Sequence, residues 1–209
     1  MIKNIKFSVN IASSEDALGI HEALKQNLIE IRDFDEITKK RKKELEKEGF
    51  LRKEVGIEYY RDLINEPHTD IYVAKDNEGK IIGFASIHKK KYNIIKVRDV
   101  VGNLSFEDEK SKELLLNEDT EFAYLDQISI LPKYKHKGIA TTIFKKVLSK
   151  IETPIVAFIV EKPLFNKASL DWHKYNGFDF SAISGGEYKG KTFKFQILIH
   201  WNKKNHDPV

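Results

Sequence analysis

The six residues Ile155–Val160 read Ile-Val-Ala-Phe-Ile-Val, an apolar run without a single polar interruption. A strand with one face in water alternates apolar and polar residues, so this run predicts a central strand that is covered on both faces. Such a strand requires a layered fold of helices and sheet. The chain has 209 residues with 41% hydrophobic residues, which is enough to bury one core, and a single domain is therefore expected over 1–209.

Strand and helix patterns alternate through the rest of the chain. Ile5 to Ile11 alternates apolar and polar residues as a half-buried strand does, and Ser13 with Asp16 is typical of the cap of a helix that continues toward Ile31. Residues 76–79 are turn formers and predict a hairpin. The other expected strands are Ile71–Ala74, Ile81–Ile87, Phe122–Leu131, Phe178–Ile183 and Phe193–His200, with helices from Gly138 and at Lys167–Tyr175. This order predicts an α/β (α+β layered) fold.

Three segments show no chemistry of their own. Asp35 to Glu48 has only two large apolar residues and ends before Gly49, which predicts a solvated helix. The segment 89–119 is polar with local apolar clusters and a short helix near Ser111–Leu116, and it is a candidate insertion in the domain. Residues 185–190 are rich in glycine and predict a turn between the last two strands.

The segment with the clearest chemistry runs from Leu125 to Ala140. A strand ends near Pro132, a short basic turn follows, and a helix with an apolar stripe begins at Gly138. The first turn of a helix exposes unpaired N–H groups and a partial positive charge, so a strand, turn and helix of this kind can bind an anion. Lys135, His136 and Lys137 add donors around that point. A small residue in such a turn also has a purely structural explanation, namely close helix packing.

Several classes of protein do not fit the sequence. There is no cysteine, so neither a disulfide, a thiolate metal ligand nor an acyl-cysteine intermediate can form. The scattered histidines lack metal-ligand spacing, and no metal is expected. Met1–Asn10 has no apolar core of a signal peptide, and no uncharged apolar run reaches the length of about 18 residues of a membrane span. We expect a cytoplasmic protein with no membrane partner.

Two motifs in register resemble the GNAT superfamily of acetyl-CoA-dependent N-acetyltransferases. In the first, Gln or Arg is followed by two variable residues, Gly, one variable residue and Gly or Ala; Lys135, Gly138 and Ala140 stand at these places. The second has Asn166, Ser169, Gly177 and Phe178 at the offsets of the family, with His173 where the family usually has Tyr. Lys135 and His173 depart from the pattern. Lysine keeps the charge of arginine but lacks its planar fork.

The resemblance implies a mixed, mostly antiparallel central sheet with helices on both faces and a site for acetyl-CoA as co-substrate. Backbone groups of Ile128, Ser129 and Ile130 would bind the pantetheine arm, and Asn166 would contact the cofactor as well as cap its helix. The turn and helix start would bind the pyrophosphate through these residues: Lys135, His136, Lys137, Gly138, Ile139, Ala140 and Thr141.

The chemistry that the resemblance implies is attack of an amine on a thioester. An amine with a pKa near 10.4 is almost fully protonated at neutral pH, which lies about 3.4 units below that pKa, so a base is needed to deprotonate it. Asp126 is the best-placed carboxylate, and strict alternation puts it on the face of Tyr124 and Ile128, where burial would raise its pKa. Its alternative is a solvent-facing carboxylate; Glu121 and Glu187 are weaker candidates. His173 would protonate the departing thiolate near its ordinary pKa, or serve only as a packed helix residue.

The sequence leaves rival functions open. Direct transfer of an acetyl group to an amine, a small molecule or a protein amine, is the first hypothesis, and a non-catalytic acyl-CoA-binding sensor or scaffold is the second. A net charge of +4 and the run Lys39–Lys43 would suit nucleic acid, but the interleaved glutamates and the lack of aromatic residues there favour a solvated helix face. Neither the acceptor amine nor the oligomeric state, a homodimer included, follows from the sequence.

Overall fold

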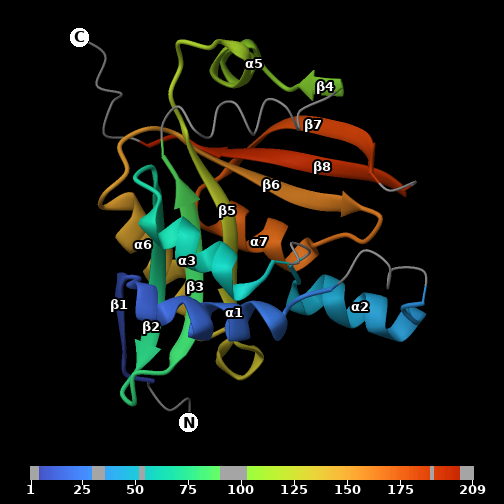
Figure 1. Ribbon diagram of the computed structural model, residues 1–209. Coiled ribbons are helices and arrows are strands. Elements are labelled where there is room, and N and C mark those ends of the chain that lie inside the picture. The colour runs from blue at the N-terminus through green and yellow to red at the C-terminus, as the bar shows by residue number, and fades with distance from the viewer. Residues whose placement is uncertain (1–4, 30–35, 52–54, 90–102, 189–190, 203–209) are drawn as a thin grey trace. The chain divides into compact units, whose positions relative to one another are not determined.

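The computed structural model describes residues 5–29, 36–51, 55–89, 103–188 and 191–202. Its strands are β1 Phe7–Ile11, β2 Thr69–Asp76, β3 Ile81–His88, β4 Asn103–Phe106, β5 Ala123–Ile130, β6 Ile155–Lys162, β7 Asp179–Tyr188 and β8 Lys191–His200. The helices are α1 Ala17–Lys25, α2 Lys39–Glu48, α3 Ile57–Asn65, α5 Glu109–Leu116, α6 Ile139–Leu148 and α7 Lys167–Tyr175, with 3-10 turns η1 Ser14–Asp16 and η3 Pro132–Tyr134. These strands form one mixed, mostly antiparallel sheet in the order β1-β2-β3-β5-β6-β8-β7-β4 (Figure 1).

The chain divides into two compact units, each assembled from three segments of sequence. The first unit contains residues 1–31, 50–87 and 126–150, and the second contains 32–49, 88–125 and 151–209. Strand β5 starts in the second unit and passes into the first after Leu125.

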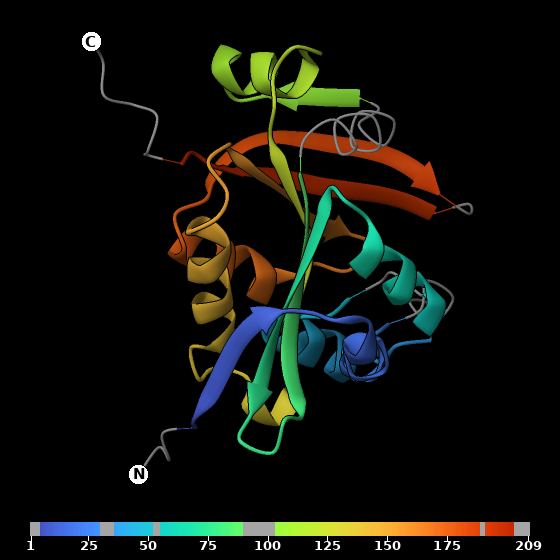
Figure 2. The same cartoon turned by 60° about the vertical axis from the view of Figure 1, so that its left-hand side comes forward.

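The first unit is a layered structure around β1, β2, β3 and the end of β5. β1 pairs with β2 in antiparallel register, with Phe7 opposite Asp76. Helices α1 and α3 pack on one face, where Ile20, Leu24, Tyr60 and Phe84 belong to one buried cluster. Helix α6 contacts β1 and β2. The strands of this unit lie between α6 on one side and α1 and α3 on the other, as Figure 2 shows.

The start of α1 forms as the sequence predicts. The backbone N–H of Ser13 donates to the Asp16 carboxylate over 3.0 Å, which is the reciprocal half of a capping box. Burial raises the pKa of Asp16, but hydrogen bonds from Lys75 and Ser13 outweigh it and hold this pKa below its ordinary value. The Lys75 ammonium lies 2.6 Å from Asp16 and thereby ties η1 to β2.

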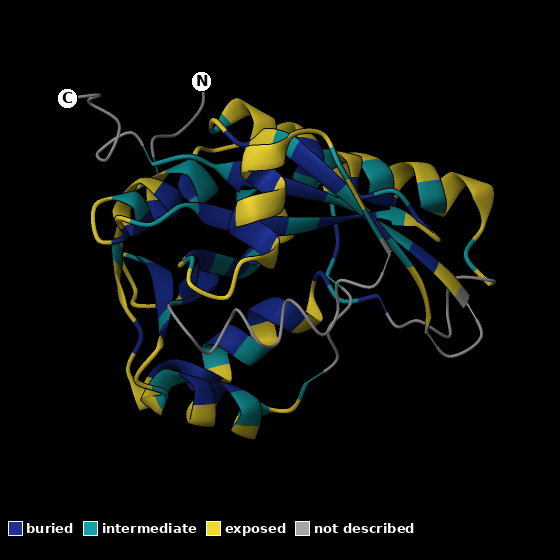
Figure 3. Cartoon of the chain, turned by 90° about the horizontal axis from the view of Figure 1, so that it is seen from above, coloured by how far each residue is buried: buried dark blue, intermediate teal, exposed yellow. Residues whose placement is uncertain are grey.

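The second unit covers β6, β7 and β8 with helices on both faces. β8 pairs antiparallel with β6 on one side and with β7 on the other, and β4 extends the sheet beyond β7. Leu114 and Leu115 of α5 pack on Val156 and Ile197, while α7 contacts β6 on the other side, as Figure 1 shows. The run Ile155–Val160 is buried at most positions (Figure 3). The prediction of a covered central strand is confirmed.

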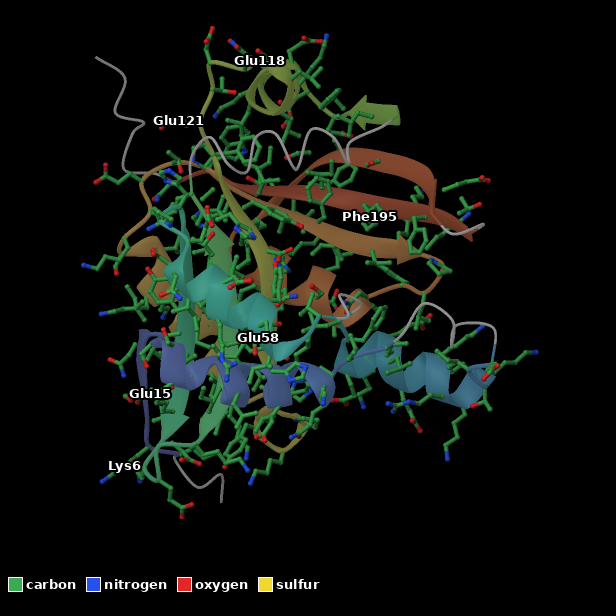
Figure 4. All side chains as sticks on the ribbon, in the orientation of Figure 1. Lys6, Glu15, Glu58, Glu118, Glu121 and Phe195 are labelled. Carbon is green, nitrogen blue, oxygen red and sulfur yellow. The ribbon has the colours of Figure 1, made fainter. Side chains whose placement is uncertain are left out.

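An aromatic row crosses the second unit from strand to strand. Ring centroids of Tyr124 and Phe158 lie 5.6 Å apart, and those of Phe158 and Phe195 lie 6.3 Å apart; Phe195 is labelled in Figure 4. Edge-to-face contacts of this kind add about 0.5–1.5 kcal/mol per pair beyond the buried area. The row therefore stabilises the pairing of β5, β6 and β8.

Some sequence-based expectations need correction. Helix α1 ends at Lys25, and Leu28 instead forms a parallel bridge with Leu51. Gly185 and Gly186 do not form a turn but lie inside β7, opposite Lys194 and Phe193, because the long ladder to β8 continues through them; residues 189–190 lie outside the described residues. Helix α3 was not predicted. The candidate insertion 89–119 contributes β4 and α5, and its residues 90–102 lie outside the described parts.

Candidate functional site

Strand β5 has two different faces along its second half. Gln127 and Ser129 are 2% and 4% exposed, whereas Asp126 and Ile128 on the alternate face are half-buried. Asp126 therefore shares the alternate face with Tyr124 and Ile128, as strict alternation predicts, and it is half-buried there, while Gln127 and Ser129 occupy the buried face. Glu121 is exposed and lies two residues before the first residue of β5 (Figure 4).

Hydrogen bonds from α3 and from the turn after α1 hold the buried face of β5. The Tyr60 hydroxyl of α3 donates to Gln127 Oε1 over 2.8 Å, and the Asn27 side chain donates to Ser129 Oγ over 2.9 Å. Burial raises the pKa of Tyr60 well above its ordinary value; Tyr59 and the Asp126 carboxylate raise it further, and the bond to Gln127 opposes them. Tyr60 is therefore a neutral hydrogen-bond donor at physiological pH.

The turn after β5 has backbone conformations that suit an anion. His136 is left-handed at φ 59° and Gly138, the N-cap of α6, is left-handed at φ 77°. The first hydrogen bond of α6 runs from Thr142 N–H to the Gly138 carbonyl over 2.9 Å, so the N–H groups of Ile139, Ala140 and Thr141 precede it. A left-handed residue turns successive N–H groups toward one point, which is the geometry of an anion-binding nest.

The charge around this turn is positive. The ammonium groups of Lys133 and Lys137 lie 4.7 Å and 5.5 Å from the ring centroid of Tyr134, and the first turn of α6 carries no acidic residue. A side chain built at Gly138 would meet no atom within 4 Å. The turn is therefore open as well as basic, and it fits a phosphate group at a helix N-terminus.

Asn166 and His173 belong to the second unit, where Asn166 caps α7 and His173 lies within it. Asn166 Oδ1 accepts from Ser169 N–H over 3.3 Å, so the residue is the helix cap that the sequence predicts. Its own N–H donates to the Val160 carbonyl over 2.9 Å, which ties the start of α7 to β6. Asn166 is 8% exposed.

His173 is 3% exposed and packs edge to face on Trp172 and Phe178. Burial lowers its pKa to about 4, and the hydrogen bond between Nδ1 and the Ser169 carbonyl, 2.7 Å long, opposes this shift only in part. Protonating the ring at pH 7 would then cost about 4 kcal/mol. The ordinary pKa that we expected for His173 is wrong, because the ring is desolvated, and the imidazole is neutral at physiological pH.

Sequence reasoning missed Asn27 and Tyr60. Their partners Ser129 and Gln127 lie 102 and 67 positions away in sequence, so no local pattern connects them. The available signal was that Gln127 and Ser129 are polar residues on the same face of the strand as Ala123 and Leu125, since buried polar groups require hydrogen-bond partners.

The comparisons with known proteins agree with this fold. Residues 34–178 match the acetyltransferase (GNAT) family. No curated protein matches the sequence.

Solved structures with the same fold cover nearly the whole chain. The ribosomal-protein-S18-alanine N-acetyltransferase from Escherichia coli has a TM-score of 0.60 and 10% identity, over 98% of this chain and 99% of that chain. NAA60 from Arabidopsis thaliana in complex with acetyl-CoA has a TM-score of 0.56 and 14% identity over 94% and 99%. The spermidine/spermine N-acetyltransferase SpeG from Vibrio cholerae has a TM-score of 0.56 and 13% identity over 95% and 94%. At these identities the likeness shows the fold.

The eight-stranded sheet and its strand, turn and helix site define a GNAT-type acetyltransferase fold. Since the family match spans more than half of its length, this chain belongs to the GNAT family of acetyltransferases, enzymes that use acetyl-CoA.

Two further findings concern metals and membranes. Within the described residues, no three His, Asp or Glu side chains lie close enough together to hold a metal ion. None of the helices in the described parts of the chain is both long and apolar enough to cross a membrane.

Proposed function

We propose that this protein transfers the acetyl group of acetyl-CoA directly to an amine within a ternary complex. The observation that carries the proposal is the basic, open turn of left-handed His136 and Gly138 at the start of α6. Bound acetyl-CoA supplies an activated acetyl thioester. No acyl-cysteine intermediate is available because the sequence has no cysteine.

Residues of the first unit would bind most of the cofactor. The N–H groups from His136 to Thr141 would hold the pyrophosphate, with Lys135 and Lys137 contributing charge. The parallel ladder between β5 and β6 consists of Ala123 opposite Ile155 and Tyr124 opposite Val156. Ile128, Ser129 and Ile130 lie beyond that ladder, which supports pairing of their backbone with the amides of pantetheine. Asn166 would contact the cofactor from α7.

Asp126 would act as the base. Its half-buried carboxylate accepts a proton from the acceptor ammonium, the amine nitrogen bonds to the thioester carbonyl carbon, and the carbon–sulfur bond breaks. The pKa of a lysine-like amine lies about 3.4 units above pH 7, so forming the free amine costs about 4.6 kcal/mol. A base that takes this proton therefore lowers the barrier to attack. As the carbon–sulfur bond breaks, the nitrogen loses its second proton, which passes through water to the departing thiolate. Burial keeps the His173 imidazole neutral, which favours water over His173 as the proton donor.

The acceptor is proposed only as an amine. The structural neighbours include an N-acetyltransferase for ribosomal-protein-S18 alanine and one for spermidine and spermine, two different kinds of amine. Membership in the acetyltransferase family favours turnover over the alternative of a non-catalytic acyl-CoA-binding module.

The test is release of free coenzyme A thiol when purified protein meets acetyl-CoA and a panel of peptide, polyamine and small-molecule amines. We expect release with at least one amine, intersecting initial-velocity lines, and no acetylated protein by mass spectrometry without an acceptor. Binding of acetyl-CoA with no thiol release from any amine would instead favour the binding module.

Asp126→Asn tests the base. We expect turnover to fall by about a hundredfold or more near neutral pH, while the affinity for acetyl-CoA stays unchanged. The deficit should shrink toward pH 10, because the acceptor then loses its proton to solvent. A deficit that is independent of pH would assign the base elsewhere.

A further inference from the structure

Asn27 lies just after α1 and connects it to the end of β5. Its side-chain nitrogen donates to Ser129 Oγ over 2.9 Å and to the Ile130 carbonyl over 3.0 Å. Asn27 is 8% exposed. A buried amide with two such bonds has one favoured position, so the bonds also fix the two residues that accept them.

The backbone of Asn27 is itself held in place. Its carbonyl accepts from Leu51 N–H over 2.8 Å, and Ile29 N–H donates to the Leu51 carbonyl over 2.8 Å. The side chain of Asn27 therefore starts from a fixed point of the first unit. The position of this side chain against β5 is therefore set by backbone hydrogen bonds on both sides of Asn27.

Strand β5 has β3 as a neighbour in the sheet, but its pairing with β6 does not extend to this end. Its ladder to β6 ends with Tyr124, whereas Leu131 N–H donates to the Ile82 carbonyl of β3 over 2.9 Å. Next comes η3 and then the turn that leads to Gly138. The bond from Tyr60 to Gln127 supports the same face two residues earlier. Helix α3 and the turn after α1 therefore each hold one buried polar residue of the strand.

We infer that Asn27 is a positioning residue for the pantetheine arm of acetyl-CoA. By engaging the Ile130 carbonyl and the Ser129 hydroxyl, it sets the backbone orientation of the residues proposed to pair with that arm. Its side-chain bonds run to Ser129 and Ile130, before the turn of His136 and Gly138, so we expect no contribution to phosphate binding. The inference rests on the proposed function, because Ser129 and Ile130 are proposed cofactor residues.

The experiment measures two ligands on the full chain by calorimetry. The affinity for acetyl-CoA depends on both the pantetheine half and the phosphate half of the proposed site. Adenosine 3′,5′-bisphosphate lacks pantetheine, so its affinity depends only on the phosphate and nucleotide half. For Asn27→Leu, nearly equal in size, we expect the acetyl-CoA Kd to rise by about tenfold, as the loss of two hydrogen bonds implies. The Kd of the bisphosphate should stay within about twofold of the wild-type value, since the turn at Gly138 is unaltered.

The control variant is Asn65→Leu. Asn65 also donates from its side chain to a backbone carbonyl, that of Arg61 over 2.8 Å, at the end of α3 in the same unit, and it should change neither affinity. Equal weakening of both ligands by Asn27→Leu, or weakening of neither, would overturn the positioning role. Failure of wild-type protein to bind acetyl-CoA would overturn the proposed function first.

A second variant keeps the test decisive if Asn27→Leu does not fold. Ser129→Ala removes one acceptor of Asn27 and leaves the bond to the Ile130 carbonyl. We expect about threefold weaker acetyl-CoA binding with unchanged binding of the bisphosphate. Unchanged acetyl-CoA affinity in this variant would contradict the inference.

Discussion

At the scale of single residues, the clearest physical signature is the neutral imidazole of His173. Its pKa is lowered to about 4 in the folded chain and is near 6.5 in an unfolded chain. Between these values the unfolded chain binds one more proton than the folded chain, so the free energy of unfolding must rise with pH over this window.

This difference gives a prediction for His173→Phe. Wild-type protein should lose about 2 kcal/mol of stability through this group when the pH falls from 7 to 5. The variant lacks the titrating group and should show a pH dependence smaller by that amount, measured by urea unfolding at both pH values. An identical pH dependence in the two proteins would show that His173 titrates normally.

The pair Tyr60 and Gln127 gives a second prediction at this scale. Tyr60→Phe leaves Gln127 Oε1 without its donor in a buried place, which should cost about 1–3 kcal/mol. Gln127→Leu alone similarly leaves the buried Tyr60 hydroxyl without its acceptor. The double variant removes both polar groups, so its cost should be less than the sum of the two single costs in urea unfolding. Simple additivity would mean that the two side chains do not interact.

Sequence reasoning worked for some residues of the site and failed for others. Gly138 and Asn166 were recognisable because their motifs are local and specify a helix start. The pKa of His173 and the role of Asn27 depend on which distant residues cover them, and one sequence does not contain that information.

At the scale of elements, Gly49 explains how α2 ends. Its φ of 74° and ψ of 160° fall in a region that is essentially confined to glycine. A Cβ atom there would lie 3.4 Å from Ala168 and Asn166 of the α7 segment, an ordinary van der Waals distance, so the preference for glycine comes from the backbone conformation. The solvated helix and its glycine stop were predictable from sequence, whereas this contact with α7 was not.

Gly49→Ala should therefore destabilise the protein by about 1–3 kcal/mol. Gly56→Ala is the matched control, because Gly56 has φ −77° and no atom within 4 Å of an added side chain; its effect should stay within about 0.5 kcal/mol. Chemical unfolding of both variants checks this. Equal losses of stability in the two variants would contradict the claim that the backbone conformation at position 49 requires glycine.

The boundaries of other elements show where local patterns suffice. Helix α7 was predicted at its observed limits because a cap and a glycine enclose an amphipathic segment. Helix α3 was overlooked although Ile57, Tyr60 and Leu63 follow helical spacing. Strand β7 runs through two glycines because its ladder to β8 outweighs their low strand propensity, and that ladder is not local.

At the scale of the whole molecule, the layered fold followed from the covered strand β6 and from the order of elements. The single domain expected from the length stays a prediction, since the chain divides into two compact units that interleave in sequence. The order of strands in the sheet was not predictable, because β5 to β6 is a parallel crossover and β8 lies between β6 and β7. Such pairings join residues far apart in the chain.

The central claim is that the turn at Gly138 binds acetyl-CoA, and calorimetric titration of wild-type protein and Gly138→Glu tests it most directly. We predict binding in the micromolar range by the wild type and none by the variant, which places a carboxylate beside the phosphates at a left-handed position, with the same circular dichroism for both proteins. Tight binding by Gly138→Glu, or no binding by a folded wild type, would contradict the account.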